Sequence, residues 1–136
     1  GYNGGGALGS GDLVNKTSPI TPANISGHTG IAKVAVLGGA GYTFTAVVFN
    51  DGALFVTGYN GNGQLGVGDQ LNKSLFERVP MMKAKITDVC AVGLSSETGL
   101  GILTDLGLYY QTGYAGESQL PEDDDESTHV PYHVQF

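Results

Sequence analysis

The stretch Gly58-Tyr59-Asn60-Gly61-Asn62-Gly63-Gln64-Leu65-Gly66-Val67-Gly68-Asp69 decides the fold, because related stretches occur before and after it. One copy runs from Gly1 to Asp12, and a weaker copy runs from Gly113 to Asp123. The copies therefore start at Gly1, Gly58 and Gly113, at a nearly constant spacing. Self-similarity at a period of about 50 residues indicates a repeat architecture. The spacing predicts repeat units at about 1–57, 58–112 and 113–136, of which the last is incomplete.

Each unit is predicted to contain three short strands and a weaker fourth. The Asp51-Gly52 pair between two apolar runs is typical of a hairpin, because glycine accepts the positive φ of such turns. The expected strands are Ile31–Val36, Thr43–Phe49 and Leu54–Thr57 in one unit, and Ile86–Val92, Gly99–Leu103 and Leu108–Gln111 in the next. Fourth strands are expected beyond a Gly-rich loop of about twenty residues, near the Val-Pro pairs of Glu77–Met81 and His129–Val134.

The apolar pattern predicts how the strands are covered. Thr45–Phe49 is nearly continuously apolar, as expected when both faces of a small sheet are covered. No helical period of useful length appears in the chain. The prediction is an all-β fold of four-stranded antiparallel sheets stacked face to face, with the prolines on edge strands.

Composition excludes several classes of protein. The chain has 136 residues and a net charge of −7, and its six Lys and Arg residues are scattered, so no nucleic-acid surface is expected. No apolar run approaches the roughly 18 residues of a membrane span. Cys90 is the one cysteine, which excludes an internal disulfide and a cysteine zinc site. Its apolar neighbours predict a small, buried residue.

No pattern of catalytic, cofactor or metal-binding residues emerges. The acidic run Glu122–Glu126 lacks the spacing of a calcium loop and is read as a solvated loop. His129 and His133 would lie about 13 Å apart on a strand, too far to share a metal. Gly61–Gly66 has dinucleotide-like spacing but no helix after it. Ser95–Glu97 lacks a nearby base. Sequons begin at Asn15, Asn24 and Asn72, and chance explains them unless the source is a eukaryotic secreted protein.

The stretch from Leu54 to Asp69 resembles the regulator of chromosome condensation repeat, the unit of a seven-bladed β-propeller. The resemblance rests on the Gly-Gln-Leu-Gly-x-Gly core at Gly63–Gly68 and covers essentially the whole chain. It implies that Gln64 ties its loop with backbone hydrogen bonds. It also implies that Leu65 packs where two units meet, with Leu8 and Leu120 in equivalent places.

The chain departs from the family pattern at several positions. Thr57-Gly58 and Thr112-Gly113 stand where the family usually has Trp-Gly, and Tyr42-Thr43 stands where it has a His-Thr or His-Ser pair. These variants resemble bacterial and bacteriophage versions of the repeat. Light sensing, which a plant member of the family performs, needs clustered tryptophans, and this segment has none.

About two and a half units are visible, whereas propellers close with roughly 4–8 blades. The prediction is therefore a partial β-propeller of four-stranded antiparallel blades. Further repeats of its own chain, or neighbouring subunits, would cover the outer faces of its first and last units.

The favoured function is a non-enzymatic scaffold that binds a protein partner through its loops, and no cofactor is expected. A surface glycan is the alternative ligand of these loops, and a virion or cell-surface adhesin component is the most specific version of this function. The alternative, implied by the family's founding member, is guanine-nucleotide exchange or regulation of a small GTPase, and an enzyme is the third reading. The candidate contacts are Tyr59, Asn72, Lys73, Phe76, Arg78 and Tyr114.

Overall fold

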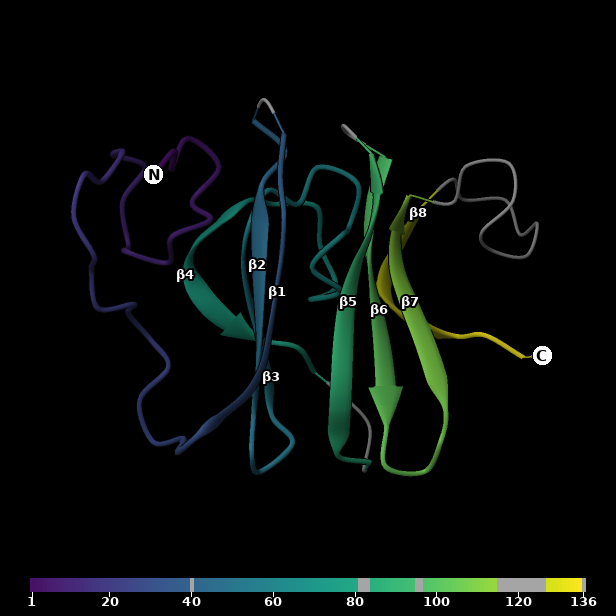
Figure 1. Ribbon diagram of the computed structural model, residues 1–136. Helices are drawn as coiled ribbons and strands as arrows, with labels where there is room; N and C mark the ends of the chain where they lie inside the picture. Colours follow the sequence, from purple (N-terminus) through teal and green to yellow (C-terminus); the bar gives the residue numbers. More distant parts are fainter. Residues whose placement is uncertain (40, 81–83, 95–96, 115–126, 136) are drawn as a thin grey trace.

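Two four-stranded antiparallel sheets stand face to face in the computed structural model, which describes residues 1–39, 41–80, 84–94, 97–114 and 127–135 (Figure 1). The first sheet is β1 (Ile31–Leu37), β2 (Phe44–Phe49), β3 (Leu54–Gly58) and β4 (Lys73–Arg78), in that order. The second is β5 (Ile86–Leu94), β6 (Glu97–Thr104), β7 (Tyr109–Tyr114) and β8 (Ser127–His133). The described ranges contain no helix, which confirms the all-β prediction. Within these ranges there is therefore no helix long and apolar enough to cross a membrane.

The two sheets have the same register, displaced by one repeat. Phe44 pairs with Gly58 in the first sheet, and Gly99 pairs with Gly113 in the second. The register shift that follows Ile31 in β1 recurs after Ile86 in β5. The repeat seen in the sequence is therefore a repeat of strand pairing, including its irregularities.

The fourth strand of the first sheet begins earlier than the Val-Pro pair suggested. β4 starts at Lys73, which pairs with Gly58, so the loop before it is residues 59–72 and is shorter than the expected twenty. Val79 still donates a backbone hydrogen bond to the oxygen of Leu54, whereas Pro80 has no N–H to continue the ladder. The pair therefore marks the end of the strand. In the second sheet Pro131 lies within β8, an edge strand as predicted.

The main core lies between the two sheets. It joins side chains of β2 and β3, such as Phe44 and Leu54, to Leu100 and Ile102 of β6. Leu65, from the loop after β3, is completely buried in this cluster, which confirms its predicted place at the junction of two units. Leu8 is half-buried, and Leu120 falls outside the described residues.

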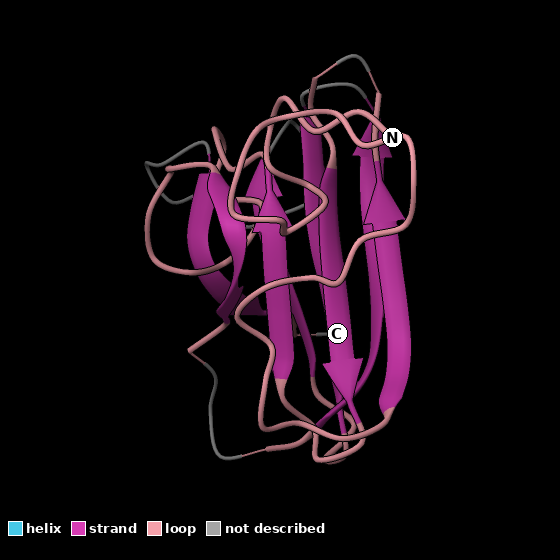
Figure 2. Cartoon of the chain, turned by 90° about the vertical axis from the view of Figure 1, so that its left-hand side faces the viewer, coloured by secondary structure: helices cyan, strands magenta, loops and turns pink. Residues whose placement is uncertain are grey.

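The other face of the first sheet is covered by the chain that precedes β1. Figure 2 shows this segment crossing in front of the strands. Ile25 packs on the cluster of Phe49 and Phe55, and the His28 ring lies 5.0 and 4.9 Å from those two rings. The Nδ2 of Asn24 donates to the backbone oxygen of Phe76 at 2.9 Å. Both faces of the first sheet are thus largely covered, in agreement with its continuous apolar strands.

The second sheet has one face that the first sheet does not cover. We call it the open face; it carries Cys90, Gly101, Leu103 and Tyr109. The prediction that Cys90 is buried is wrong, because its side chain projects from β5 on this face and is exposed. The apolar neighbours of Cys90 in the sequence point to the opposite face, into the core, since successive strand residues alternate.

Candidate interaction surface

A network of polar contacts fixes the loop between β3 and β4. The Oδ1 of Asn60 accepts the N–H of Leu65 at 2.9 Å, and its Nδ2 donates to the backbone oxygen of Asp69 at 2.8 Å. The backbone N–H of Asn60 donates to the Oδ1 of Asn72 at 2.8 Å. The Oδ1 of Asp69 in turn accepts the N–H of Leu71 at 2.9 Å. We call this network the cage, because one buried amide connects both ends of the loop.

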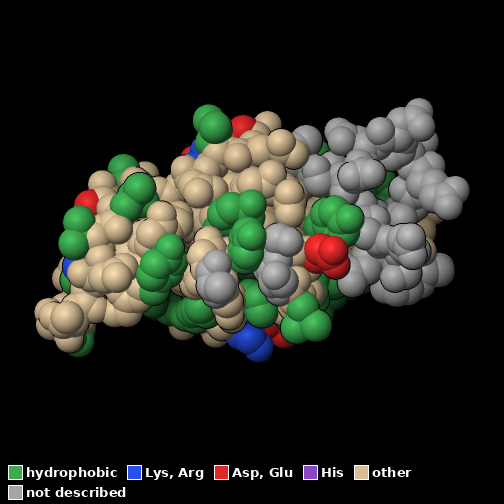
Figure 3. All heavy atoms as spheres, turned by 90° about the horizontal axis from the view of Figure 1, so that it is seen from above, with side chains coloured by type: hydrophobic (Ala, Val, Ile, Leu, Met, Phe, Trp, Pro, Cys, Tyr) green, Lys and Arg blue, Asp and Glu red, His purple; other side chains and the backbone are tan. Residues whose placement is uncertain are grey.

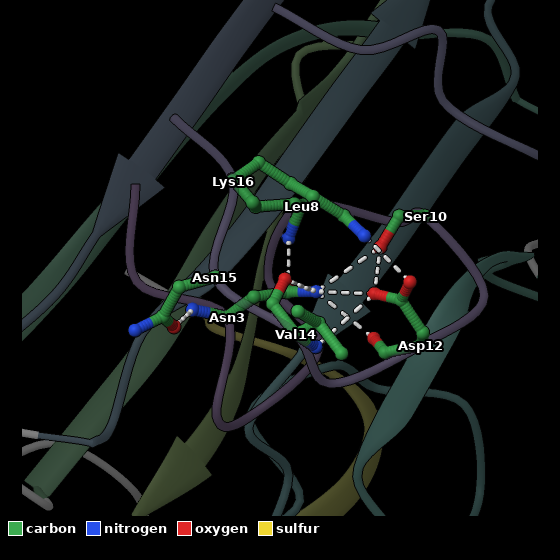
Figure 4. A network of polar contacts seen from close by, with 7 residues as sticks. All are labelled: Asn3, Leu8, Ser10, Asp12, Val14, Asn15 and Lys16. Carbon is green, nitrogen blue, oxygen red and sulfur yellow. Dashed lines mark hydrogen bonds and ion pairs between the residues drawn. The ribbon is translucent and has the colours of Figure 1, made fainter. Parts of the chain in front are cut away.

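The same cage occurs one repeat earlier (Figure 4). The Nδ2 of Asn3 donates to the backbone oxygen of Asp12 at 2.9 Å, and its N–H donates to the Oδ1 of Asn15 at 2.8 Å. The Oδ1 of Asp12 accepts the N–H of Val14 at 3.1 Å. Asparagine suits the central position because its side chain both donates and accepts. In the third copy of the sequence Ala115 stands at this position, so the side-chain amide is absent there.

A lysine neutralises the carboxylate of each cage. The Nζ atoms of Lys16 and Lys73 lie 2.6 Å from the Oδ2 atoms of Asp12 and Asp69 respectively. Hydrogen bonds from Lys16, Ser10 and the Val14 N–H lower the pKa of Asp12 to about 2. The hydrogen bond from Lys73 likewise lowers the pKa of Asp69. Both carboxylates therefore stay ionised and hold their loops at ordinary pH.

Lys73 is held on two sides. Its Nζ also lies 3.1 Å from the Oε2 of Glu77, on the same strand. Partial burial lowers the pKa of Lys73, but hydrogen bonds to Asp69 and Glu77 outweigh it, so the pKa lies above its ordinary value. The Lys73 ammonium group thus stabilises the loop. The exposed residues that precede it, Leu71 and Asn72, are better placed to contact a partner.

Each cage holds an exposed aliphatic side chain at the same repeat position. Leu71 is 68% exposed and Val14 is 62% exposed, and each follows the caged aspartate by two residues. Asn72 and Asn15, next along the chain, are exposed as well. Seen from above, exposed hydrophobic side chains lie at separate points with few charged groups between them (Figure 3). On this face the exposed apolar groups are therefore separate from one another.

A second set of contacts ties each loop to the unit that follows it. Gln64 is fully buried, and its Nε2 donates to the Oγ1 of Thr98 in β6 at 3.1 Å. Its Oε1 accepts the N–H of Asn62 at 2.9 Å, which confirms that Gln64 ties its loop to backbone. The Oγ1 of Thr112 donates to the backbone oxygen of Gln64 at 2.5 Å. The Oγ1 of Thr57 likewise donates to the backbone oxygen of Gly6. A buried threonine hydroxyl therefore connects the loop of one unit to a strand of the next; we call this contact the clasp between units.

The structure brings only some of the candidate contacts together. Asn72 and Lys73 both contact the cage of the loop between β3 and β4. Tyr59 is the first residue of the same loop; it is half-buried, and its ring lies 5.0 Å from the ring of Tyr42. Arg78 is exposed at the far end of β4, roughly 17 Å along the strand from Lys73. Tyr114 is half-buried at the end of β7, in the other sheet. These residues do not form one site.

Phe76 is not the exposed contact that the sequence suggested. It is only 3% exposed, because its ring turns inward from β4 onto the cluster of Phe49 and Phe55. Gly9 lies directly against this ring, and a Cβ at Gly9 would come within 2.4 Å of it. Phe76 therefore holds the first long loop on the first sheet.

Metal-binding groups are not found where the structure can be described. Residues 1–39, 41–80, 84–94, 97–114 and 127–135 contain no group of three or more His, Cys, Asp or Glu side chains suited to a metal ion. The acidic run Glu122–Glu126 lies outside these ranges, as does Ser95–Ser96.

Sequence reasoning missed the residues that build the surface, chiefly Asn60 and Asp69. The signal was present, because Asn3 and Asp12 stand one repeat earlier together with the matching lysine. Polar residues retained at equal spacing between two otherwise divergent loops indicate a shared polar network. The two exposed aliphatics, Val14 and Leu71, carry the same signal.

Comparison with known proteins supports the repeat assignment. No family model matches the chain. Ultraviolet-B receptor UVR8 of Arabidopsis thaliana is 29% identical over 135 residues, which are 99% of this chain and 29% of the receptor. Human WBSCR16 matches 98% of the chain with a TM-score of 0.76 at 21% identity, and Prp20p of Saccharomyces cerevisiae matches 100% with a TM-score of 0.70 at 19% identity.

The chain spans about a third of the length of each of these proteins, namely 29%, 32% and 33%. The structural matches show the fold, which is that of a β-propeller segment. UVR8 is itself built of regulator of chromosome condensation repeats. The sequence match, the two stacked sheets and the structural likenesses together support the regulator of chromosome condensation repeat family for this chain.

Proposed function

We propose that the chain is a non-enzymatic module that binds another protein through the exposed ends of its two caged loops. The observation that carries this proposal is the pair Val14 and Leu71. Both are exposed, both occupy the same repeat position, and both have their backbone fixed by a caged aspartate. A single exposed aliphatic is unremarkable on a protein surface. Two exposed aliphatic side chains at equivalent positions of two rigid loops form an apolar contact point that recurs with the repeat.

The geometry suits binding for energetic reasons. Burying a leucine side chain contributes about 1.5–3 kcal/mol. Because the cage already holds the loop in one conformation, little backbone entropy is lost when a partner docks. Each caged carboxylate is paired with a lysine, so an apolar surface can approach the loops without desolvating an unpaired carboxylate.

Site-specific crosslinking identifies the partner and tests the surface. A photo-crosslinking residue replaces Leu71 in one variant and Leu106 in another; Leu106 is 70% exposed at a hairpin of the second sheet and is the matched control. Crosslinked proteins are identified in the source organism, and the purified candidate is then titrated by calorimetry. We expect Leu71→Ser to weaken binding by about 10- to 150-fold and Leu106→Ser to leave it unchanged. Equal effects of the two substitutions would contradict the proposal.

Two more specific forms of the proposal follow from the sequence. One is a virion or cell-surface adhesin component, and the other is recognition of a surface glycan by the same loops. A glycan array distinguishes them, since Leu71→Ser and native protein should differ in glycan binding only under the second form.

Regulation of a small GTPase, including guanine-nucleotide exchange, is the second candidate function. It is favoured by the structural match to Prp20p, a protein with binding properties to Gsp1p and histones. The test measures binding of the natural polypeptide to Gsp1p and the release of labelled GDP from small GTPases of its source. Release that is unchanged at saturating protein would rule out the exchange activity.

A further inference from the structure

Three asparagines of the chain are followed by glycine, a pairing that makes an asparagine prone to deamidation. They are Asn3, Asn60 and Asn62, and every other asparagine precedes a larger residue. Glycine has no Cβ, so its backbone nitrogen can approach the preceding side chain freely and attack the amide carbon. Two of these asparagines, Asn3 and Asn60, are the central residues of the two cages.

The reaction at Asn60 follows from the chemistry of the pair. The backbone nitrogen of Gly61 forms a bond to the Cγ of Asn60 and loses its proton to water, and Nδ2 leaves as ammonia. One water molecule then opens the cyclic imide. Water that adds at Cγ gives aspartate, and water that adds at the main-chain carbonyl carbon gives isoaspartate, which lengthens the backbone. Overall, one water is consumed and one ammonia is released.

The cage opposes this reaction. The Nδ2 of Asn60, the atom that must leave, donates to the backbone oxygen of Asp69 at 2.8 Å and to its Oδ1 at 3.1 Å. The Oδ1 of Asn60 accepts the N–H of Leu65, so the planar amide is held at both ends. Asn60 is also 0% exposed, which keeps its amide from the water that must accept the proton. The cage must therefore open before the reaction can proceed.

Asn3 is protected in the same way, and Figure 4 shows its amide at the centre of the contacts. Its Nδ2 donates to the backbone oxygen of Asp12 at 2.9 Å, and its Oδ1 accepts the N–H of Leu8 at 2.9 Å. Asn3 is likewise 0% exposed. The two cages thus protect equivalent asparagines by equivalent contacts.

Asn62 is restrained differently. Its residue is only half-buried, but the N–H of Gly63, the group that would attack it, donates to the backbone oxygen of Asn60 at 3.0 Å. Protection of the amide itself by a cage is therefore a property of Asn3 and Asn60.

Deamidation would also prevent the cage from closing again. A carboxylate at position 60 has no N–H to donate to the backbone oxygen of Asp69. It would instead place a second negative charge beside the Oδ1 of Asp69, which the Nδ2 of Asn60 now approaches to 3.1 Å. Lys73, which lies 2.6 Å from the Oδ2 of Asp69, would then face two carboxylates. The buried oxygen of Asp69 loses its donor, so the loop opens at that end.

We propose that Asn3 and Asn60 are latent deamidation sites, that each is closed by its own cage, and that conversion opens its loop irreversibly. The reaction needs only water and adds one negative charge at each site. Each cage is therefore a one-way chemical switch, and local opening of its loop sets the rate. This inference depends on the cage contacts and is independent of the partner that the loops bind.

The test measures the rate of conversion at Asn3 and at Asn60 separately. The native protein is held at mildly alkaline pH, in buffer or in urea above its unfolding transition, and its peptides are analysed by mass spectrometry with fragmentation that separates Asn60 from Asn62. We expect both sites to convert at least about tenfold more slowly in buffer than in urea. Equal rates in the two conditions would overturn the proposal.

Two variants test whether the protection is local. Asn72→Ala removes the acceptor of the Asn60 N–H in one cage, and Asn15→Ala removes the acceptor of the Asn3 N–H in the other. Asn72→Ala should raise the rate in buffer by roughly 2- to 12-fold at Asn60 and leave Asn3 unchanged, and Asn15→Ala should do the reverse. Leu71→Ser, at an exposed side chain of the same loop, is the matched control and should change neither rate.

Unchanged rates in both variants would overturn the proposal, because the cage contacts would then have no part in the protection. A rise at both sites in either variant would overturn it as well, because global unfolding would then control the reaction.

Discussion

Replacing Leu65 with alanine should destabilise the protein by an amount that the packing fixes. The side chain is completely buried in the core that joins the two sheets. The substitution removes three carbon atoms, and at about 0.8 kcal/mol for each the lost transfer free energy is about 2.4 kcal/mol. The cavity adds to this, since strands on both sides hold the site open, and the total should lie between about 2.4 and 5 kcal/mol.

Urea unfolding of the natural polypeptide measures this loss, provided that the slope of the transition is the same for both proteins. Leu65→Met is the control that keeps the volume, and it should cost less than about 1.5 kcal/mol. Leu8→Ala, at the equivalent but half-buried position, should cost less than Leu65→Ala. A loss below about 1 kcal/mol for Leu65→Ala would refute the reasoning that this leucine locks two units together.

Three further predictions concern the polar contacts. Asn60→Ala removes the acceptor of a buried N–H and should cost about 1–3 kcal/mol, with faster hydrogen exchange at the Leu65 amide; an unchanged rate would count against the cage. Asp12 has a pKa lowered from 3.8 to about 2, so its contribution to stability is present above pH 4 and is lost as the pH falls toward 2; Asp12→Asn should abolish that part of the acid dependence, seen in unfolding midpoints at pH 5 and 2.5. Thr112→Val removes the buried hydroxyl that donates to the Gln64 carbonyl and should cost about 1–3 kcal/mol by urea unfolding, whereas a neutral effect would show that this hydrogen bond between units is dispensable.

The repeat spacing predicted the strands of both sheets well, because turn residues and apolar runs are local signals. Asp51-Gly52 placed the β2–β3 hairpin correctly, and β3 differs from its expected range by one residue. The start of β4 was missed because it depends on a tertiary pairing, that of Lys73 with Gly58, which no local pattern encodes.

The face of the sheet on which a residue lies was harder to predict than the strand to which it belongs. Cys90 was assigned to the wrong environment because β5 is apolar on both faces, so its alternation does not show which face is covered. Phe76 was misplaced because it was read as part of the loop, whereas it lies within β4 and is buried. The cage was open to prediction, since Asn60 and Asp69 recur at the repeat spacing. The exposure of the aliphatic side chain in the loop could not be predicted, because whether Leu71 faces solvent depends on the direction that the loop takes in the folded protein.

The central claim is that two repeat units stack face to face and that the loop of one is locked between both sheets by Leu65. Methyl NOE spectroscopy on the natural polypeptide with labelled Leu, Val and Ile tests this most directly. The account predicts NOEs from the Leu65 methyl groups to residues of the first sheet, such as Val48, and of the second sheet, such as Ile102. NOEs confined to one sheet, or to neither, would contradict it.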